Sequence, residues 1–252
     1  MSLNTPLALF TRWRGLPILE ELKERFFIVG HRGAKGLEPE NTLKSVRRAL
    51  ELGVDAVEVD VRVSGDGYPV VIHDETVDRT TDGSGLVAEM SLEELRRLDA
   101  GGGEKIPLFE EVLREVHGKA VLFVEFKVLE AVTPVLEKVE EMKAWKSILF
   151  ISFHPDHLLK VKEYRRDAYI GLIYSQPSDG IVLAKKIGAV AVLPQYRLAT
   201  EKAVAFAKRL KLMVVPWVVN DLETGLKLKS YGVNGLATDR PDILLKLREY
   251  SG

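Results

Sequence analysis

The sequence predicts a closed (β/α)8 barrel, and three observations lead to this fold class. Eight short apolar runs rich in β-branched residues alternate with amphipathic segments from residue 26 onward. Such alternation is typical of βαβ units and a parallel sheet, and a count of eight favours a closed barrel over an open sheet. The length of 252 residues fits one barrel built as a single domain, so we expect one domain over 1–252.

The expected strands and helices follow one another in strict alternation. The strands are predicted over residues 26–30, 55–63, 120–127, 148–153, 169–174, 190–194, 212–219 and 235–238. The helices between them are predicted over residues 41–52, 107–116, 133–145, 156–165, 179–187, 200–210 and 222–231. Residues 242–249 supply a last helix, and residues 18–26 predict an extra helix before the first strand.

One segment departs from this alternation. Residues 70–73 form a further extended run that only Ser64-Gly-Asp-Gly67 and two more residues separate from Val63. A parallel crossover needs about a dozen residues or more, so this run must form an antiparallel hairpin with the second strand. The hairpin brings His73 back beside Asp60. Residues 74–103 then form a small, polar, glycine-rich insertion rather than a separate domain.

Composition excludes several classes of protein. A net charge of -1 argues against a nucleic-acid-binding protein, and no apolar run reaches the roughly 18 residues of a membrane span, so no stable membrane insertion is expected. Charged residues interrupt the first thirty positions, which predicts no signal peptide and a cytoplasmic location. The absence of cysteine restricts any metal to carboxylate, carbonyl or histidine ligands. Few Asn and Gln with 29% charged residues resemble a protein from a hot environment.

Charged side chains gather at the carboxyl ends of the first three expected barrel strands, where barrel enzymes hold their active sites. The set comprises His31, Arg32, Glu58, Asp60, His73, Asp74, Glu125 and Lys127. Glu58 and Asp60 are two apart and therefore share one face of a strand, while the valines that alternate with them occupy the other face. Glu125 and Lys127 have the same spacing, so we expect all these groups to converge.

These residue types indicate metal-assisted phosphodiester chemistry. The three carboxylates of Glu58, Asp60 and Glu125 repel one another unless a cation neutralises them, and Mg²⁺ or Ca²⁺ is the natural choice, with Mn²⁺ also compatible. Arg32 and Lys127 would cover the anionic part of a substrate, since guanidinium groups suit phosphate oxygens. The alternative for Glu125 and Lys127 is that they form an internal ion pair with each other instead of binding a metal and a phosphate.

Two histidines supply what hydrolysis of a phosphodiester needs. One takes a proton from the nucleophile and the other gives a proton to the leaving alkoxide, and we assign these roles to His31 and His73. The residues leave open which histidine is the acid, and whether water or a substrate hydroxyl attacks. By contrast, His154 and His157 surround a helix start at Pro155, and His117 suits a helix carboxyl end, so these three are interpreted as structural.

A series of motifs resembles the glycerophosphodiester phosphodiesterase family. They are His31-Arg-Gly33, Pro39-Glu-Asn-Thr42, Val57-Glu-Val-Asp60, Gly67-Tyr-Pro-Val-Val-Ile-His-Asp74, Arg79-Thr-Thr81, Ile106-Pro-Leu-Phe-Glu-Glu-Val-Leu113, Glu125-Phe-Lys127, Ser152-Phe153, Trp217-Val-Val-Asn220 and Asn234-Gly-Leu-Ala-Thr-Asp239. They follow in order from residue 29 to 244, within a family-like region of about 26–248. The main role of the second motif is interpreted as a helix start, with Pro39 near the first helical position, Asn41 and Thr42 as polar capping residues, and Glu40 near the site.

The resemblance implies a TIM barrel that hydrolyses glycerophosphodiesters to sn-glycerol 3-phosphate and an alcohol. It places a divalent metal on the residues matching Glu58, Asp60 and Glu125, and acid–base catalysis on His31 and His73. Trp217 would form a wall of the substrate site. The family's Trp-Thr-Val-Asn is here Trp217-Val-Val-Asn220, which bears on the substrate rather than on the reaction.

Two alternatives stand beside this interpretation. One is a lysophospholipase D-type phosphodiesterase that acts on glycerol-headed lipids at the same site. The other is a non-catalytic barrel that binds phosphorylated ligands. In each case the expected partner is a small molecule, and the sequence leaves the oligomeric state open.

Overall fold

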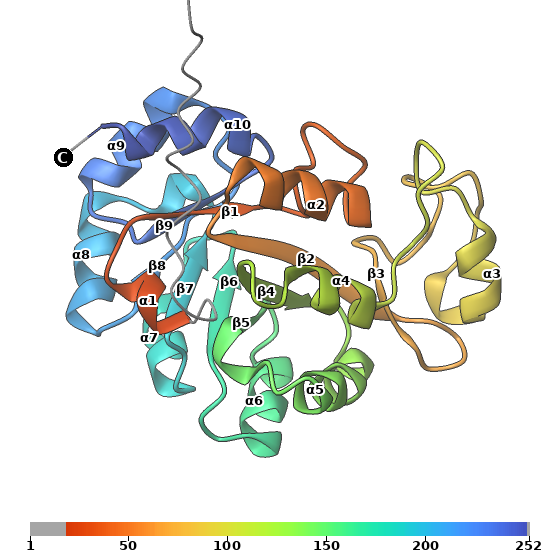
Figure 1. Ribbon diagram of the computed structural model, residues 1–252. Helices are drawn as coiled ribbons and strands as arrows, with labels where there is room; N and C mark the ends of the chain where they lie inside the picture. The colour runs from red at the N-terminus through yellow and green to blue at the C-terminus, as the bar shows by residue number, and fades with distance from the viewer. Residues whose placement is uncertain (1–18, 251–252) are drawn as a thin grey trace, which may run out of the picture.

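Parallel strands surrounded by helices make up most of the structure, a computed structural model that describes residues 19–250 (Figure 1). The strands are β1 (Phe27–Gly30), β2 (Ala56–Val63), β3 (Pro69–Val71), β4 (Val121–Phe126), β5 (Ile148–Ser152), β6 (Ile170–Tyr174), β7 (Ala191–Pro194), β8 (Met213–Val214) and β9 (Gly235–Thr238). The helices are α1 (Leu19–Lys23), α2 (Leu43–Leu52), α3 (Leu92–Arg97), α4 (Phe109–Val116), α5 (Val132–Glu141), α6 (Pro155–Tyr164), α7 (Gly180–Lys186), α8 (Glu201–Arg209), α9 (Leu222–Ser230) and α10 (Pro241–Leu244).

The wall of the barrel runs in the order β8-β7-β6-β5-β4-β2-β1-β9, and every neighbouring pair in that order is parallel. Backbone hydrogen bonds close the seam between β8 and β9: Val219 N donates to Ala237 O, and Ala237 N donates to Pro216 O, each at 3.0 Å. The predicted (β/α)8 barrel is therefore confirmed.

Alternation along β2 separates the two sides of the barrel wall. Val57, Val59 and Val61 are fully buried in the cluster that joins the strands to the surrounding helices. Side chains of the opposite face, such as Ala56, belong to the interior cluster, to which Leu19 of α1 also contributes. Because side chains alternate along a strand, Glu58 and Asp60 point into the barrel.

The hairpin predicted after the second barrel strand is also confirmed. β3 pairs antiparallel with β2, with Val71 opposite Val61. The insertion that follows is more ordered than its polar composition suggested. It contains α3, whose first turn is closed by reciprocal hydrogen bonds between Ser91 and Glu94, and a small core of its own. That core consists of Val70, Ile72, Val77, Val87, Leu95, Ala100 and Ile106.

Several element bounds differ from the prediction. The expected strand over 212–219 is only two residues long, although Val215 N and Trp217 N still donate to Val192 O and Pro194 O along β7. The helix expected over 133–145 ends at Glu141, and Trp145 lies in a separate short 3-10 turn. The last helix is α10 followed by a 3-10 turn over Leu245–Arg248. Residue 18, where the extra first helix was expected to begin, lies outside the described residues.

Within residues 19–250, no helix combines the length and the apolar character that crossing a membrane requires.

Candidate functional site

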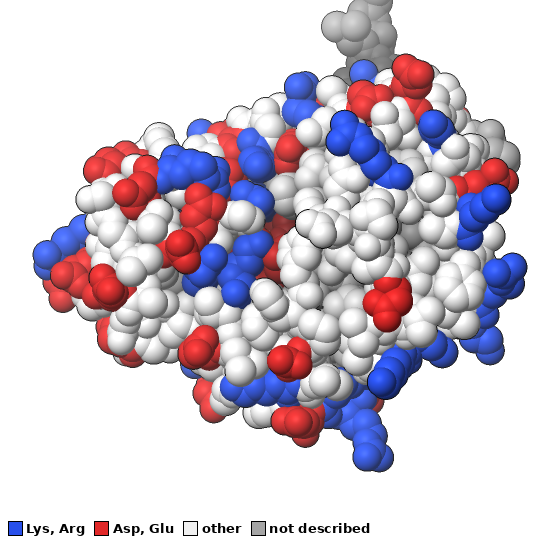
Figure 2. Space-filling view, turned by 180° about the vertical axis from the view of Figure 1, so that it is seen from behind, with Lys and Arg blue, Asp and Glu red and all other residues white. Residues whose placement is uncertain are grey.

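The predicted site residues converge on one pocket at the carboxyl ends of the barrel strands. The pocket is lined by Val29, His31, Arg32, Glu58, His73, Phe123, Glu125, Lys127, Ile151, Phe153, Ile173, Leu193, Trp217 and Ala237. Figure 2 shows a hollow with acidic atoms on its floor, basic side chains on one side and uncharged side chains on the other. This distribution matches a pocket that binds an anion at one end and an apolar or neutral group at the other.

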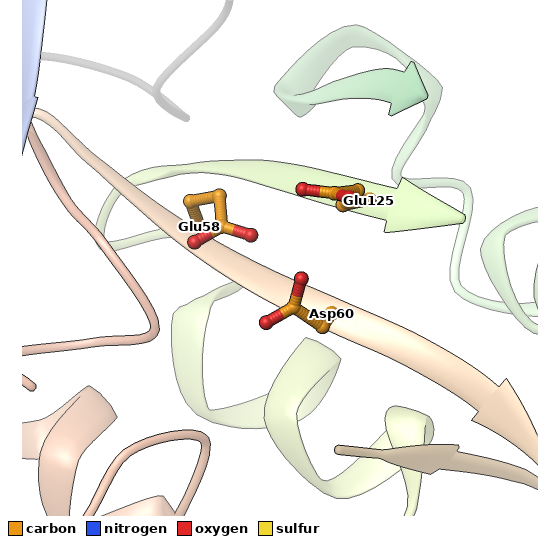
Figure 3. A group of neighbouring side chains, drawn as sticks. All are labelled: Glu58, Asp60 and Glu125. Atoms are coloured by element: carbon orange, nitrogen blue, oxygen red, sulfur yellow. The ribbon is translucent and has the colours of Figure 1, made fainter. Parts of the chain in front are cut away.

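Three acids form a cluster at this pocket, of which Glu58 and Glu125 line it. Glu58 and Asp60 come from β2 and Glu125 from β4, where Asp60 and Glu125 are register partners. Each residue offers a carboxylate oxygen, and these oxygens lie within 4.8 Å of one another (Figure 3). The three residues are 4%, 0% and 8% exposed, so water cannot screen their mutual repulsion.

Burial and repulsion act strongly on these carboxyl groups. Burial raises the pKa of Glu58 well above its ordinary value, and the charges of Asp60 and Glu125 raise it further. Burial and then the charge of Asp60 raise the pKa of Glu125 to about 7. Burial also works against ionised Asp60, but Lys127 and Arg32 outweigh it and lower the pKa of Asp60 to about 2. Ionising all three acids is therefore unfavourable without a further cation, because their three negative charges exceed the two positive charges of Arg32 and Lys127.

Unpartnered oxygens show where a further cation fits. Glu58 Oε1 and Asp60 Oδ1 are buried and accept no hydrogen bond from any residue that the structure describes. Asp60 Oδ1 has Lys127 Nζ at 3.1 Å as an ion-pair partner, whereas Glu58 Oε1 has no hydrogen-bond partner among the described residues. Buried polar atoms are almost always satisfied. The all-oxygen donor set therefore fits a hard divalent cation.

Arg32 lies at the edge of the acid cluster, directly after β1. Its backbone N donates to Glu58 Oε2 at 2.8 Å, its Nη1 donates to Glu40 Oε1 at 2.7 Å, and its Nε lies 3.2 Å from Asp60 Oδ2. The backbone of Arg32 has φ 51°, an unfavourable region for a long side chain. This strained turn presents both a backbone donor and a guanidinium group to the pocket.

Asn41 corrects the interpretation of the second motif. Helix α2 begins at Leu43 with Thr42 as its N-cap, so Pro39 lies before the helix rather than in its first turn. Asn41 has φ 59° and is 3% exposed, and its Nδ2 donates to Asp60 Oδ2 at 2.9 Å while its Oδ1 accepts from Asp60 N at 3.3 Å. Asn41 therefore fixes Asp60, a role that only the folded chain reveals.

Lys127 forms ion pairs with Glu125 Oε1 and with Asp60 Oδ1. The internal Glu125–Lys127 ion pair, stated above as the alternative, is thus present. Lys127 nevertheless lines the pocket. Lys127 can therefore neutralise the acids and face an anionic ligand at the same time.

Each of the two candidate catalytic histidines contacts a carboxylate through Nδ1. His31 Nδ1 lies 2.7 Å from Asp239 Oδ1, and its Nε2 lies 3.9 Å from Glu58 Oε2. His73 Nδ1 lies 2.6 Å from Asp74 Oδ1. A carboxylate at Nδ1 holds the proton on that nitrogen and leaves Nε2 for proton transfer. Burial lowers the pKa of His73.

The apolar side of the pocket centres on two aromatic rings. Phe153 and Trp217 contact edge to face, with ring centroids 5.7 Å apart and an interplanar angle of 89°. Trp217 Nε1 donates to Leu193 O at 2.8 Å, which fixes the indole. Trp217 packs on the interior core and also lines the pocket, so it serves as barrel core and as pocket wall together.

The interpretation of the other histidines agrees with the structure. Pro155 opens α6, and the buried His157 Nδ1 contacts Ser152 Oγ and Phe126 O. His117 is the C-cap of α4. Sequence reasoning gave Asp239 no individual role and Asn41 only a role at a helix start, although Asn is among the residue types that most readily adopt positive φ. No local pattern pairs Asp239 with a histidine 208 positions away.

Comparisons with known proteins agree on one family. The model of the glycerophosphoryl diester phosphodiesterase family matches residues 31–243. A glycerophosphodiester phosphodiesterase of Caldanaerobacter subterraneus subsp. tengcongensis is 34% identical over 242 residues, which cover 89% of this chain and 98% of that protein. The structure of an Oleispira antarctica phosphodiesterase in complex with the product sn-glycerol-3-phosphate is similar, with TM-score 0.83, 28% identity, and coverage of 89% and 97%. A glycerophosphodiester phosphodiesterase from Thermotoga maritima gives TM-score 0.77 and 28% identity, with coverage of 89% and 99%.

The family match extends from the first candidate catalytic residue, His31, to Ile243, so it includes every charged side chain and histidine assigned to the site above. The resemblance drawn from the motifs is thereby confirmed. The chain belongs to the glycerophosphoryl diester phosphodiesterase family and is a phosphoric diester hydrolase.

Proposed function

We propose that this enzyme hydrolyses glycerophosphodiesters to sn-glycerol 3-phosphate and an alcohol, using a divalent metal ion and two histidines. One observation carries the proposal. Glu58 and Glu125, two cationic side chains and two histidines that each contact a carboxylate line the same pocket, and the carboxylate of Asp60 lies beside those of Glu58 and Glu125. The sn-glycerol-3-phosphate held by the similar Oleispira antarctica phosphodiesterase supports the choice of substrate class.

Charge arithmetic supports both the metal and the anionic substrate. The acids Glu58, Asp60 and Glu125 against the cations Arg32 and Lys127 leave one net negative charge in the fully ionised cluster. Binding one divalent ion turns this into one net positive charge, which complements the single negative charge of a phosphodiester. Such an ion, held by the three acids, would polarise the phosphoryl group and stabilise its developing charge.

The proposed roles of the protein groups follow from their positions. The guanidinium of Arg32 and the ammonium of Lys127 bind the non-bridging phosphate oxygens and orient the phosphorus for attack. His31 and His73 divide the proton transfers, because each holds Nδ1 against a carboxylate and keeps Nε2 for the substrate. One ring removes the proton of the attacking hydroxyl, and the other protonates the leaving alkoxide.

Replacement of the histidines tests these roles. We expect His31→Ala and His73→Ala to lower turnover of glycerophosphocholine by about 10²-fold or more each, since each removes a general acid or base. His117→Ala is the matched control, because that histidine caps α4 away from the pocket lining. If both site variants kept near wild-type turnover, the catalytic assignment would be wrong.

A release assay tests the substrate and the ion. Enzyme stripped with EDTA should release no glycerol phosphate from a panel of glycerophosphodiesters until Mg²⁺, Ca²⁺ or Mn²⁺ is restored. Transient cyclic glycerol phosphate identifies the substrate's own hydroxyl as the nucleophile, whereas ¹⁸O from water in the first-formed product identifies water. Full activity in EDTA would contradict the metal.

The aromatic wall favours a second candidate substrate. Phe153 is 37% exposed at the pocket and contacts Trp217, which offers an apolar surface to the alcohol part of a diester. A lysophospholipid presents such an apolar group on the same phosphodiester. The test measures kcat/KM for a lysophospholipid and for glycerophosphocholine in the wild type and in Phe153→Ala. If the lipid binds the aromatic wall, Phe153→Ala lowers kcat/KM for the lysophospholipid more than it lowers kcat/KM for glycerophosphocholine.

A further inference from the structure

We propose that Arg79, a residue of the insertion, is a positioning residue that holds His73 and Arg32 in place from the two sides of the pocket. The inference rests on the proposed function, since it concerns how two of its groups are oriented. It starts from an unbroken chain of contacts. In order, the chain joins His73, Asp74, Arg79, Glu40 and Arg32.

Arg79 makes a two-pronged contact with each of two carboxylates. Its Nε and Nη2 donate to the two oxygens of Asp74 at 2.6 and 3.1 Å. Its Nη1 and Nη2 donate to the two oxygens of Glu40 at 2.9 and 2.8 Å. Only the planar, five-donor guanidinium group can serve two carboxylates in this way.

Arg79 thus forms a bridge between Asp74 and Glu40, and the Asp74 end of this bridge orients His73. Asp74 is one residue from His73 and accepts at Oδ1 from both the imidazole and Arg79 Nη2. Without Arg79 the aspartate side chain loses the contacts that fix its plane. A base or acid that is oriented by a third group depends on that group for its geometry, so the imidazole would lose its fixed direction.

The Glu40 end keeps Arg32 available to the substrate. Glu40 is mostly buried and lies between the two arginines, with Arg32 Nη1 at 2.7 Å. Burial works to raise the pKa of Glu40, but Arg79 and Arg32, with a smaller contribution from Lys35 at 3.7 Å, lower it to about 2. Because Arg79 neutralises this carboxylate, Arg32 is not its sole counter-ion and can share its charge with a phosphate. Loss of Arg79 would tie Arg32 more tightly to Glu40.

The backbone around Arg79 is held firmly enough for such a role. Val77 is fully buried in the small core of the insertion. Thr81 N and Thr81 Oγ1 both donate to Val77 O, at 3.0 and 2.8 Å, which closes the turn that carries Arg79. The insertion therefore presents the guanidinium from a fixed base rather than from a loose loop.

Another arginine of the insertion provides a matched control. Arg96 of α3 makes a two-pronged contact with Glu111 of α4 and also donates to Ile106 O. It fastens the insertion to the barrel as Arg79 does, but it touches neither histidine nor Arg32. If a substitution merely loosened the insertion, Arg79→Lys and Arg96→Lys would both lower activity. Loss of the contacts to Asp74 and Glu40 would lower activity only in Arg79→Lys.

Steady-state kinetics on glycerophosphocholine test the proposal with Arg79→Lys, Arg96→Lys, His73→Ala and the Arg79→Lys/His73→Ala double variant. Lysine keeps the charge but cannot make four directed hydrogen bonds. We expect Arg79→Lys to lower kcat/KM by about 10–100-fold, through a lower kcat and a higher KM, while Arg96→Lys stays within about twofold of wild type. In the His73→Ala background, the Arg79 substitution should still raise KM but lower kcat no further, because its effect on kcat passes through His73.

Three results would overturn the role of Arg79. They are wild-type kinetics in Arg79→Lys, an equal loss in Arg96→Lys, or an undiminished fall in kcat when Arg79→Lys is added to His73→Ala. The failure of the proposed function has a different signature, since near wild-type turnover of His73→Ala alone would refute it. A strong loss in His73→Ala together with an unaffected Arg79→Lys would refute only the bridge.

Discussion

Replacing Glu58 by glutamine tests the metal site without relying on catalysis. Glu58 Oε1 is a buried oxygen for which the described residues supply no hydrogen-bond partner. An amide keeps the size of the side chain and can still accept from Arg32 N, now at 2.8 Å. It also removes one of three crowded negative charges. We therefore expect the metal-free variant to be at least as stable as the metal-free wild type.

The expected effect of the ion on stability can be worked out from mass action. An ion at 100 times its dissociation constant stabilises the folded protein by about 2.7 kcal/mol. For a chain of this size that corresponds to a rise in Tm of about 5–11 °C. Removing a ligand weakens binding by at least the ~10–100-fold seen when outer-shell partners are lost. At the same ion concentration the Glu58→Gln variant should then gain only about 0.4–1.4 kcal/mol, or about 1–6 °C.

Differential scanning calorimetry with and without Mg²⁺, Ca²⁺ or Mn²⁺ measures both quantities. Glu51→Gln is the matched control, because Glu51 is an exposed acid of α2 that pairs only with Arg48 at 3.3 Å. Its ion-dependent shift should equal that of wild type. An undiminished shift in Glu58→Gln would refute the assignment of this carboxylate as a ligand, and so would a metal-free variant several degrees less stable than the metal-free wild type.

Three further expectations concern stability. Asn41→Ala removes two hydrogen bonds to Asp60 and places alanine at positive φ, so urea denaturation should show a loss of about 2–4 kcal/mol. Glu40 has its pKa lowered to about 2, so its contribution of up to about 3 kcal/mol is present above pH 4.5 and lost as pH falls toward 2. Glu40→Gln should therefore unfold more easily at pH 7 and show a smaller decline than wild type between pH 4.5 and 2. The scarcity of amides predicts a Tm above about 65 °C by calorimetry, and a lower midpoint would end the hypothesis of a hot source.

The sequence predicted the barrel and the acid cluster because both depend on regular local patterns. Alternation along β2 was enough to place Glu58 and Asp60 on the interior face, and Val57, Val59 and Val61 on the helix face, as the structure confirms. The hairpin followed from chain length alone, since six residues cannot make a parallel crossover. Such inferences need no knowledge of distant contacts.

The predictions that failed depend on tertiary contacts. Asn41 adopts positive φ because its amide bonds both the backbone and the carboxylate of Asp60, so the segment before α2 forms a site residue rather than a helix turn. The insertion has the polar composition of a loop, yet the spacing of Ser91 and Glu94 is a helix-start signal. Strand β8 covers only two residues of its apolar run, although hydrogen bonds to β7 continue through Trp217.

The partners of the two histidines show why part of the site lies beyond sequence reasoning. Asp239 follows the last strand and reaches His31 only because β9 pairs with β1 and closes the barrel. Asn220 holds this aspartate in turn, donating from Nδ2 to Asp239 Oδ2 at 3.1 Å. The direction of His31 is thus a consequence of barrel closure.

His73 depends on a different structural unit. Its carboxylate partner is fixed by Arg79, and that arginine is fixed by the small core of the insertion rather than by the barrel seam. The two groups of the proposed acid–base pair are therefore held by two separately packed parts of the chain. Local opening of the insertion would release His73 while His31 stays in place, because the contacts of His31 with Asp239 and Thr238 lie within the barrel. The proposed acid–base pair therefore requires both the barrel and the insertion, whereas the candidate metal-binding acids belong to the barrel alone.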